Sequence, residues 1–238
     1  MTGGAGNDAY YVDRATDQVV ELSGGGTDTV YSAVDLDLSN FGYVDTFSGP
    51  TEYEIENLVL TGNATAGTGN AFNNTLTGNT LDNTLSGLAG NDVLDGDLGN
   101  DTLIGGLGGD KYMFGLGGGV DTIVETGGND ELNFGAGIDA DELWFERSGN
   151  NLVVSVLDTG DKVIVSNWYN SADNQVETFR SGDGQVMDRS SIDALVSAMA
   201  GFSPASSATS TGIHVDDPRL GLPNQSGSIA AAINSAWN

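Results

Sequence analysis

The chain has 238 residues, of which seven are basic and thirty-four acidic, giving a formal net charge of −27. This balance argues against nucleic acid and anionic membrane surfaces as partners, because both are bound through basic patches. The absence of cysteine excludes a disulfide framework and a thiolate metal site, and no apolar run approaches the ~20 residues that a membrane-spanning helix needs.

The first recognisable element is a nine-residue unit at 3–11, GGAGNDAYY, with Asp8 in sixth place and Tyr10 in eighth. No signal peptide precedes it, so we expect further chain upstream of Met1. Beyond this unit the nine-residue period stops, and hydrophobic alternation predicts short strands instead. We expect these strands at 18–21, 29–34, 34–38 and 53–60, with a loop at 40–51 that contains two glycines and a proline.

The nine-residue unit returns at Gly69. Two weakened units carry asparagine in sixth place (Asn74 and Asn83), and three full units follow without a gap at 87–113, GLAGNDVLD GDLGNDTLI GGLGGDKYM. Each full unit has glycine first, aspartate sixth (Asp92, Asp101, Asp110) and a large apolar or aromatic residue eighth (Leu94, Leu103, Tyr112). A fixed period predicts stacked turns, with the eighth-position side chains pointing inward as a thin apolar ladder.

The spacing of the acidic residues predicts which turns stack. In a coil with two strands per turn, successive units alternate sides, so stacked neighbours come from units two apart, as Asp92 and Asp110 do. Three further pairs are two residues longer in spacing, which we interpret as the same stacking where the regular coil passes into end turns. These pairs are Asp101 with Asp121, Asp110 with Asp130, and Asp8 with Asp28.

The repeated unit supplies the ligands that a hard divalent cation prefers. Calcium takes six to eight oxygens at ~2.3–2.6 Å from carboxylates and backbone carbonyls. We expect glycines at positions one, two and four to adopt positive φ and direct carbonyls inward. A solvated acidic surface, as in halophilic proteins, would explain the charge alone, but the regular spacing of the acids favours bound cations. Magnesium demands stricter geometry, and zinc lacks ligands because the single histidine, His214, lies in the C-terminal tail.

The GGxGxDxUx pattern resembles the calcium-binding nonapeptide repeat of RTX proteins, which bacterial type I systems secrete. The resemblance implies an all-β fold, a parallel β-roll, in which carbonyls at positions one and three join the sixth-position carboxylate around several Ca²⁺ ions. Asn74 and Asn83 offer only a neutral amide, so their turns should bind calcium weakly or stack by hydrogen bonding without metal. The metal ligands so implied are Gly3, Ala5, Asp8, Asp28, Asn83, Gly87, Ala89, Asp92, Gly96, Leu98, Asp101, Gly105, Leu107, Asp110, Asp121 and Asp130.

From residue 139 glycines become fewer and aromatics more frequent. We expect antiparallel strands at 142–147, 152–157 and 162–167, a hairpin at 176–180 and 185–187, and a helix from about Ser190, where Ser190 and Asp193 have the spacing of a capping box. Ile192, Leu195, Val196 and Met199 share one apolar face of that helix. The segments LWF (143–145), GNNL (149–152), DKV (161–163) and NWY (167–169) resemble the haemolysin-type calcium-binding-related segment that follows RTX repeats.

Residues 202–238 are rich in serine, alanine and glycine, which predicts a flexible tail with a short apolar helix at 229–237. Their position and composition resemble the C-terminal secretion signal of type I substrates. We therefore divide the chain into a calcium-binding roll at 1–138 with a strand-rich insertion at about 12–68, an antiparallel segment and helix at 139–201 that cap the roll, and a secretion signal at 202–238.

These features predict a calcium-binding module that folds on meeting extracellular calcium and serves the type I secretion and folding of a larger toxin, adhesin or enzyme. Its partners would be calcium, the secretion machinery and upstream cargo domains, without nucleic acid or membrane insertion. Enzymatic activity is not expected, because GxSxG and HExxH motifs are absent and one histidine cannot supply both a base and metal ligands. The alternative is an extracellular module that binds carbohydrate or another surface ligand through the position-seven row of Thr75, Thr84 and Thr102, although Val93 and Lys111 interrupt it.

Overall fold

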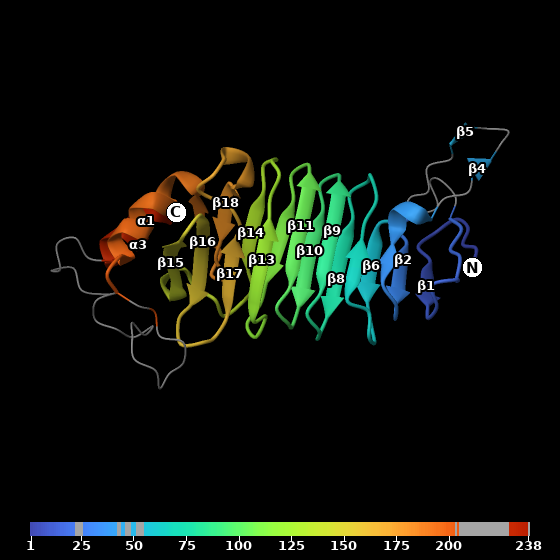
Figure 1. Cartoon of the computed structure of the whole chain (residues 1–238), viewed down its shortest axis with the longest axis horizontal. Helices are drawn as coiled ribbons and strands as arrows, with labels where there is room; N and C mark the ends of the chain where they lie inside the picture. The colour runs from blue at the N-terminus through green and yellow to red at the C-terminus, as the bar shows by residue number, and fades with distance from the viewer. Residues whose placement is uncertain are drawn as a thin grey trace.

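The computed structural model describes residues 1–21, 26–41, 44–45, 49–50, 55–202, 204 and 229–237. Two sheets build an elongated roll whose strands lie side by side along the long axis, with the N-terminus near one end and the helices at the other (Figure 1). Neighbouring strands along the roll are parallel, whereas antiparallel pairs occur at the C-terminal cap and in one short pair near the N-terminus. No helix in the described ranges is long and apolar enough to cross a membrane.

The nine-stranded sheet runs in the order β1 (Ala9–Val12), β2 (Thr29–Ser32), β6 (Asn57–Leu60), β8 (Thr75–Asn79), β10 (Val93–Asp97), β12 (Lys111–Phe114), β14 (Glu131–Phe134), β18 (Thr178–Arg180) and β19 (Val186–Asp188). The eight-stranded sheet runs in the order β15 (Leu143–Ser148), β16 (Asn151–Val156), β17 (Lys162–Val165), β13 (Val120–Val124), β11 (Thr102–Leu107), β9 (Thr84–Ala89), β7 (Ala66–Thr68) and β3 (Leu36–Asp37). Successive units of the repeat therefore alternate between the two sheets, as the spacing predicted.

The strand register confirms the predicted stacking. Leu94 lies beside Leu76 on one side and Tyr112 on the other, so stacked neighbours are two units apart. The longer steps stack in the same way, because Lys111 pairs with Glu131, Thr102 with Thr122, and Ala9 with Thr29. Each of these paired residues directly follows an aspartate of the pairs proposed above.

The eighth-position side chains form the core of the roll. Leu76, Leu85, Leu94 and Tyr112 are 0% exposed and Leu103 is 1% exposed. Burying a leucine contributes roughly 1.5–3 kcal/mol, so this single column stabilises a turn that is otherwise mostly backbone and glycine. The predicted apolar ladder is confirmed.

Residues 12–68 differ from the expected insertion. Strands β2 and β6 lie in the nine-stranded sheet between β1 and β8, and β3 and β7 continue the other sheet, so this segment adds turns to the roll. The strand expected at 34–38 is also wrong: only β3 forms, and a 3-10 turn, η1 (Leu38–Asn40), follows because the Asp37 carboxylate accepts a hydrogen bond from Ser39 N–H at 2.9 Å. At 18–21 there is an isolated bridge from Val20 to Thr2.

Parts of the expected loop at 40–51 lie outside the described residues. Within it, β4 (Val44–Asp45) and β5 (Gly49–Pro50) form a short antiparallel pair. Tyr53, the first residue of the strand expected at 53–60, also lies outside the described ranges, as does His214. The described part of that strand forms β6, with Leu58 and Leu60 buried.

The C-terminal cap closes the roll with the expected antiparallel strands β15, β16 and β17, the hairpin β18–β19 and helix α1 (Ile192–Met199). The short 3-10 turns of this part are η2 (Ala140–Glu142), η3 (Ala172–Asn174) and η4 (Arg189–Ser191). The predicted capping box is wrong, because η4 leads directly into α1 and the N-cap residue, Ser191, makes no side-chain cap bond. Ile192, Leu195 and Met199 are buried, whereas Val196 is only partly buried.

Helix α3 (Ile229–Ala236) packs onto the cap beside α1 (Figure 1). Ile229, Ile233 and Trp237 are buried in the same core as the cap, and the Trp237 ring lies 6.4 Å from that of Phe145. Of the tail expected to be flexible, this segment therefore has a fixed place. Trp144 and Trp168 are also core residues, at 1% and 2% exposure.

Candidate calcium sites

The sixth-position residues form two hydrogen-bonded ladders along the edges of the roll. On the edge of the nine-stranded sheet, the N–H of Asp92 donates to Oδ1 of Asp110 at 2.8 Å, and the N–H of Asp110 donates to Oδ1 of Asp130 at 2.7 Å. On the other edge, the N–H of Asp101 donates to Oδ1 of Asp121 at 3.0 Å. At the N-terminal end, the N–H of Asp8 donates to Oδ1 of Asp28 at 2.8 Å. Asp28, Asp110, Asp121 and Asp130 each thus use one carboxylate oxygen to hold the preceding turn.

The other carboxylate oxygen has no partner. Oδ2 of Asp28, Asp92, Asp101, Asp110 and Asp130 is buried without a hydrogen bond. An unpaired buried carboxylate oxygen is costly, since burying charge requires a compensating partner. None of the ion pairs among the described residues involves these aspartates. A cation that binds Oδ2 would supply the missing partner.

The glycine at position one leaves room for that oxygen. A Cβ built on Gly87 would overlap Oδ2 of Asp92, and one built on Gly96 would overlap Oδ2 of Asp101. Our expectation of positive φ at this position is wrong. Positive φ occurs at positions two and four instead, as at Gly90 (φ 121°) and even at Leu88 (φ 77°). Position one therefore needs glycine for space, whereas position four needs it for backbone conformation.

Burial raises the pKa of the ladder carboxyls because the charged form loses its hydration. The pKa of Asp92 and of Asp121 rises to about 7, and that of Asp101 and of Asp130 to about 6. Hydrogen bonds from backbone N–H groups oppose this rise without cancelling it. Such raised values indicate carboxylates placed for a positive partner that the chain itself does not provide.

The predicted ligands of neighbouring turns are brought together. Gly105 lies next to Gly87 in the stack, since the following residues Leu107 and Ala89 are paired in register. The carbonyl of Leu107 accepts a hydrogen bond from Gly90 N–H at 2.9 Å, which leaves its second lone pair for a cation. Position-one and position-three carbonyls and the sixth-position carboxylates therefore meet at the same edge, and Gly96, Leu98, Gly3 and Ala5 hold the equivalent places in their own units.

The asparagine turns are satisfied without metal. Oδ1 of Asn83 accepts a hydrogen bond from Asn79 N–H at 2.6 Å, and its Nδ2 donates to the carbonyl of Ala64 at 3.3 Å. Asn74 makes the same pattern, accepting from Asn70 and donating to Ile55. Both polar atoms of each amide are bonded, so stacking by hydrogen bonds is the alternative that this geometry favours.

Glutamates that do not fit the repeat pattern continue the ladder at its ends. The N–H of Asp28 donates to Glu56 at 2.7 Å, and that of Asp130 donates to Glu177 at 2.8 Å. Glu177 is itself paired with Arg189 at 2.6 Å. At this end the ladder therefore terminates at a carboxylate that a cationic side chain of the protein, Arg189, neutralises. Sequence spacing missed these glutamates because the turns that carry them have no fixed period.

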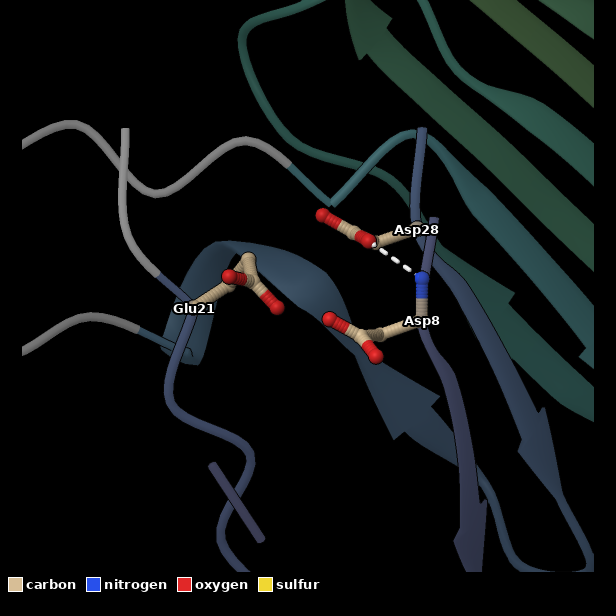
Figure 2. A group of neighbouring side chains, drawn as sticks. All are labelled: Asp8, Glu21 and Asp28. Atoms are coloured by element: carbon tan, nitrogen blue, oxygen red, sulfur yellow. Dashed lines mark hydrogen bonds between the residues drawn. The ribbon is translucent and has the colours of Figure 1, made fainter. Parts of the chain in front are cut away.

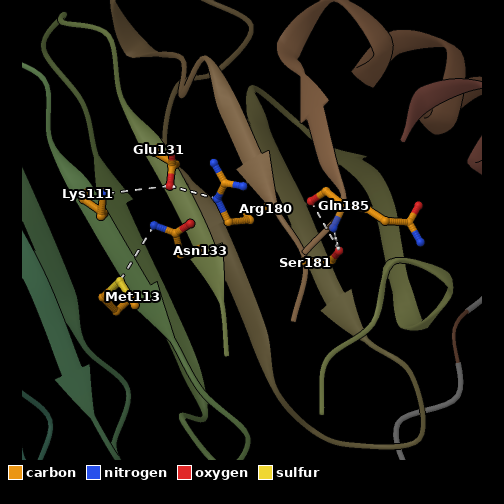
Figure 3. A network of polar contacts seen from close by, with 7 residues as sticks. All are labelled: Lys111, Met113, Glu131, Asn133, Arg180, Ser181 and Gln185. Carbon is orange, nitrogen blue, oxygen red and sulfur yellow. Dashed lines mark hydrogen bonds and ion pairs between the residues drawn. The ribbon is translucent and has the colours of Figure 1, made fainter. Parts of the chain in front are cut away.

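A second ion-pair network lies next to this end, on strands β12, β14 and β18 (Figure 3). Glu131 lies between Lys111 at 3.9 Å and Arg180 at 3.4 Å, and Asn133 contacts Met113 on the neighbouring strand. Exposed pairs of this kind contribute little each. They concentrate three of the seven basic residues of the chain, Lys111, Arg180 and Arg189, where the roll meets its cap.

Two families match the chain. Residues 68–103 and 77–112 match the RTX calcium-binding nonapeptide repeat (4 copies). Residues 151–191 match the haemolysin-type calcium binding protein related domain. The first match covers the asparagine and aspartate units whose geometry is described above, and the second covers most of the cap. The chain therefore contains an RTX region, in which calcium-binding nonapeptide repeats precede a haemolysin-type calcium-binding-related domain.

Proposed function

We propose that this RTX region is a calcium-dependent folding module that serves the type I secretion and extracellular folding of a larger exported protein. The observation that carries the proposal is the row of buried, unpartnered Oδ2 atoms on stacked aspartates. Several buried carboxylates without counter-charges oppose folding, and a column of one apolar side chain per strand cannot offset them together with chain entropy. Calcium supplies the counter-charge and so couples binding to folding.

The proposed ligands are the carbonyls of positions one and three and the carboxylates of position six. They are Gly3, Ala5, Asp8, Asp28, Gly87, Ala89, Asp92, Gly96, Leu98, Asp101, Gly105, Leu107, Asp110, Asp121 and Asp130. Asn83 is left out because its amide is hydrogen bonded within the protein. Extracellular sites of this kind have affinities of roughly 10⁻⁴–10⁻³ M, so millimolar external calcium would fill them and low cytosolic calcium would not.

A circular-dichroism titration tests this proposal. The strand signal should appear as calcium rises into the millimolar range, and magnesium should be much less effective because it keeps its waters and demands octahedral geometry. A strand signal that a chelator leaves unchanged would refute the folding switch. The role in secretion has its own test: deletion of 202–238 should abolish export, while the calcium-induced strand signal of the roll at 1–138 persists although the cap loses the packing of α3.

The boundaries at 1–138, 139–201 and 202–238 belong to this proposal, as does the absence of catalysis. The packing of α3 on the cap adds a condition, because export through the tail would require the helix to leave the cap or to be read before the cap folds. Limited proteolysis with and without calcium would measure whether α3 is released from the cap or protected on it.

A surface-binding module is the second candidate, and one observation favours it. The expected row of Thr75, Thr84 and Thr102 is wrong in one member, because Thr75 lies on β8 in the nine-stranded sheet. Thr84, Thr102 and Thr122 are paired in register across β9, β11 and β13, which gives the eight-stranded sheet a regular threonine row. Regular rows of this kind suit a periodic ligand such as a polysaccharide. Loss of carbohydrate binding on changing all three threonines to valine would support it, and a glycan array without any ligand would exclude it.

A further inference from the structure

In two clusters a glutamate joins two of the stacked aspartates, which makes three carboxylates. Asp8, Glu21 and Asp28 converge at the N-terminal turns (Figure 2). Asp110, Glu125 and Asp130 form the second cluster where the regular coil meets the cap. In each cluster the three residues present carboxylate oxygens that all lie within 4.8 Å of one another.

The glutamate in each cluster occupies the place of a position-one glycine. Ile104 pairs with Val124, so Glu125 follows in register with Gly105 of the previous turn. Val20 forms a bridge with Thr2, so Glu21 follows in register with Gly3. In a regular turn that place must stay empty, because a Cβ on Gly105 would overlap Oδ2 of Asp110. In the two clusters this position carries a carboxylate side chain instead, that of Glu21 or Glu125.

A tyrosine holds each glutamate. The hydroxyl of Tyr112 donates to Oε1 of Glu125, and that of Tyr10 donates to Oε2 of Glu21. Thr126 N–H binds the other oxygen of Glu125 at 3.1 Å. These neutral donors orient the carboxylates without neutralising them.

Five of the six carboxylates are buried, and Asp8 is partly buried. Glu125 is 0% exposed, Glu21 1%, Asp28 0%, and Asp110 and Asp130 1% each. Oδ2 of Asp28, Asp110 and Asp130 has no hydrogen-bond partner. Asp110, Glu125 and Asp130 take part in none of the ion pairs of the described residues. Three like charges confined at this distance repel one another, and a multivalent cation in their midst would neutralise them.

We propose that Glu21 and Glu125 are calcium ligands that complete two three-carboxylate sites, which bind calcium more tightly than the sites between regular turns. The inference rests on the proposed calcium-binding function and deepens it. Calcium affinity rises with the number of charged ligands, and these sites offer three carboxylates where the regular turns offer two. Asp101 and Asp121 provide an internal contrast, since the residue in register with Gly96 beside them is Phe114.

The two sites would fill first as calcium rises. Because binding is coupled to folding, the turns around them would form before the regular turns between them. One tight site lies at the N-terminal turns and the other at the junction with the cap, so folding of the stacked turns would start at both ends and proceed toward the middle.

Competition with a chromophoric chelator measures this directly on the whole chain. Wild type should show two tight sites followed by a weaker phase. Glu21→Gln and Glu125→Gln should each weaken one tight site by about tenfold or more, and the double variant should show only the weak phase. Glu146→Gln removes one negative charge from strand β15, away from both clusters, and should match wild type.

Terbium luminescence locates the early ions even if a variant folds poorly. Tyr10 and Tyr112 touch the clusters, so terbium bound there is excited through tyrosine. Tyr112→Phe should lower the emission at low ion occupancy by one site's share, and unchanged early emission would overturn the assignment. If wild type binds calcium and folds but the glutamine variants titrate like Glu146→Gln, this inference alone is wrong. If wild type binds no calcium, the proposed function fails as well.

Discussion

Asp92→Asn should stabilise the metal-free roll and weaken its response to calcium. The Asp92 side chain is 1% exposed, and its Oδ1 accepts a hydrogen bond from Asn74 N–H at 2.7 Å. An amide keeps that bond. The new amide N–H₂ group replaces the unpartnered Oδ2 and can donate toward the carbonyl of Asn73 in the preceding turn. Asn74 and Asn83 donate in the same way to the carbonyls of Ile55 and Ala64 in the turns before them.

The size of the effect follows from the pKa. Burial raises the pKa of Asp92 from 3.8 to about 7, and about three units at ~1.4 kcal/mol each would cost about 4 kcal/mol. Solvent screening reduces this, so we expect the metal-free variant to gain roughly 2 kcal/mol at pH 8. A carboxyl group whose pKa is raised by folding destabilises the fold fully when the pH is above its pKa in the folded state. It has no such effect when the pH is below its pKa in the unfolded state. The gain should therefore shrink as pH falls from 7 and vanish near pH 3.8.

Urea unfolding followed by circular dichroism is the assay, with a chelator present and an excluded osmolyte that keeps the metal-free wild type folded. At pH 8 in about 10 mM calcium, which is ~100-fold above a Kd of ~10⁻⁴ M, the order should reverse, because the variant loses about 3 kcal/mol of linkage. The exposed Asp141→Asn should change stability by less than about 0.5 kcal/mol in either medium. A variant that is less stable than wild type in chelator at pH 8, or equally favoured at pH 4, would refute the reasoning.

Three further changes test other parts of the roll. Gly87→Ala places a Cβ against Oδ2 of Asp92 and 2.7 Å from the carbonyl of Gly105, so the calcium concentration at its folding midpoint should rise. In the control Gly115→Ala the new Cβ meets nothing within 4 Å, so that variant should be neutral or stabilised by ~0.4–1 kcal/mol. Similar calcium midpoints for the two variants would contradict the steric role of position one. Leu94→Ala should cost about 2–5 kcal/mol in calcium by chemical denaturation, against ~0.5 kcal/mol for Leu98→Ala, which is 43% exposed. Arg189→Gln removes the ion pair to Glu177 and should lower thermal stability by about 1 kcal/mol at low salt, an effect that would be absent if the ladder needed no terminal cation.

The nine-residue period was sufficient to predict the stacking of the turns, their register and the core, whereas the parallel roll was implied by the resemblance to RTX repeats. A fixed spacing translates directly into stacking, so Asp92, Asp110 and Leu94 could be placed from their numbers alone. The aspartate pairs that lie twenty positions apart could be predicted as well, once two residues were assumed to be inserted into the eighteen-residue step. Space at position one was misread as a need for positive φ, because a glycine in a sequence does not reveal whether it serves conformation or clearance.

The N-terminal turns could not be predicted in this way because their steps are unequal. Thr29 pairs with Asn57 and Leu36 with Gly67, and no constant period contains both steps. Short alternating segments therefore suggested an inserted unit, although the strands belong to the same sheets. Glu56, Glu125 and Glu177 were missed for the same reason, since their place in the ladder appears only when the register is known. Only Glu125 of the three has a sequence signal, since it stands close before a sixth-position aspartate, Asp130.

The ladder also has a direction. In every hydrogen bond between sixth-position residues the N–H comes from the earlier turn and the carboxylate from the later one, as from Asp92 to Asp110 and from Asp110 to Asp130. Removing a later turn leaves a buried N–H without an acceptor, whereas removing an earlier turn frees a carboxylate oxygen that water can serve. The order of turns is therefore not symmetric in energy. Each turn depends on the turn that follows it, and the last dependence is met by Glu177, which Arg189 holds within the cap.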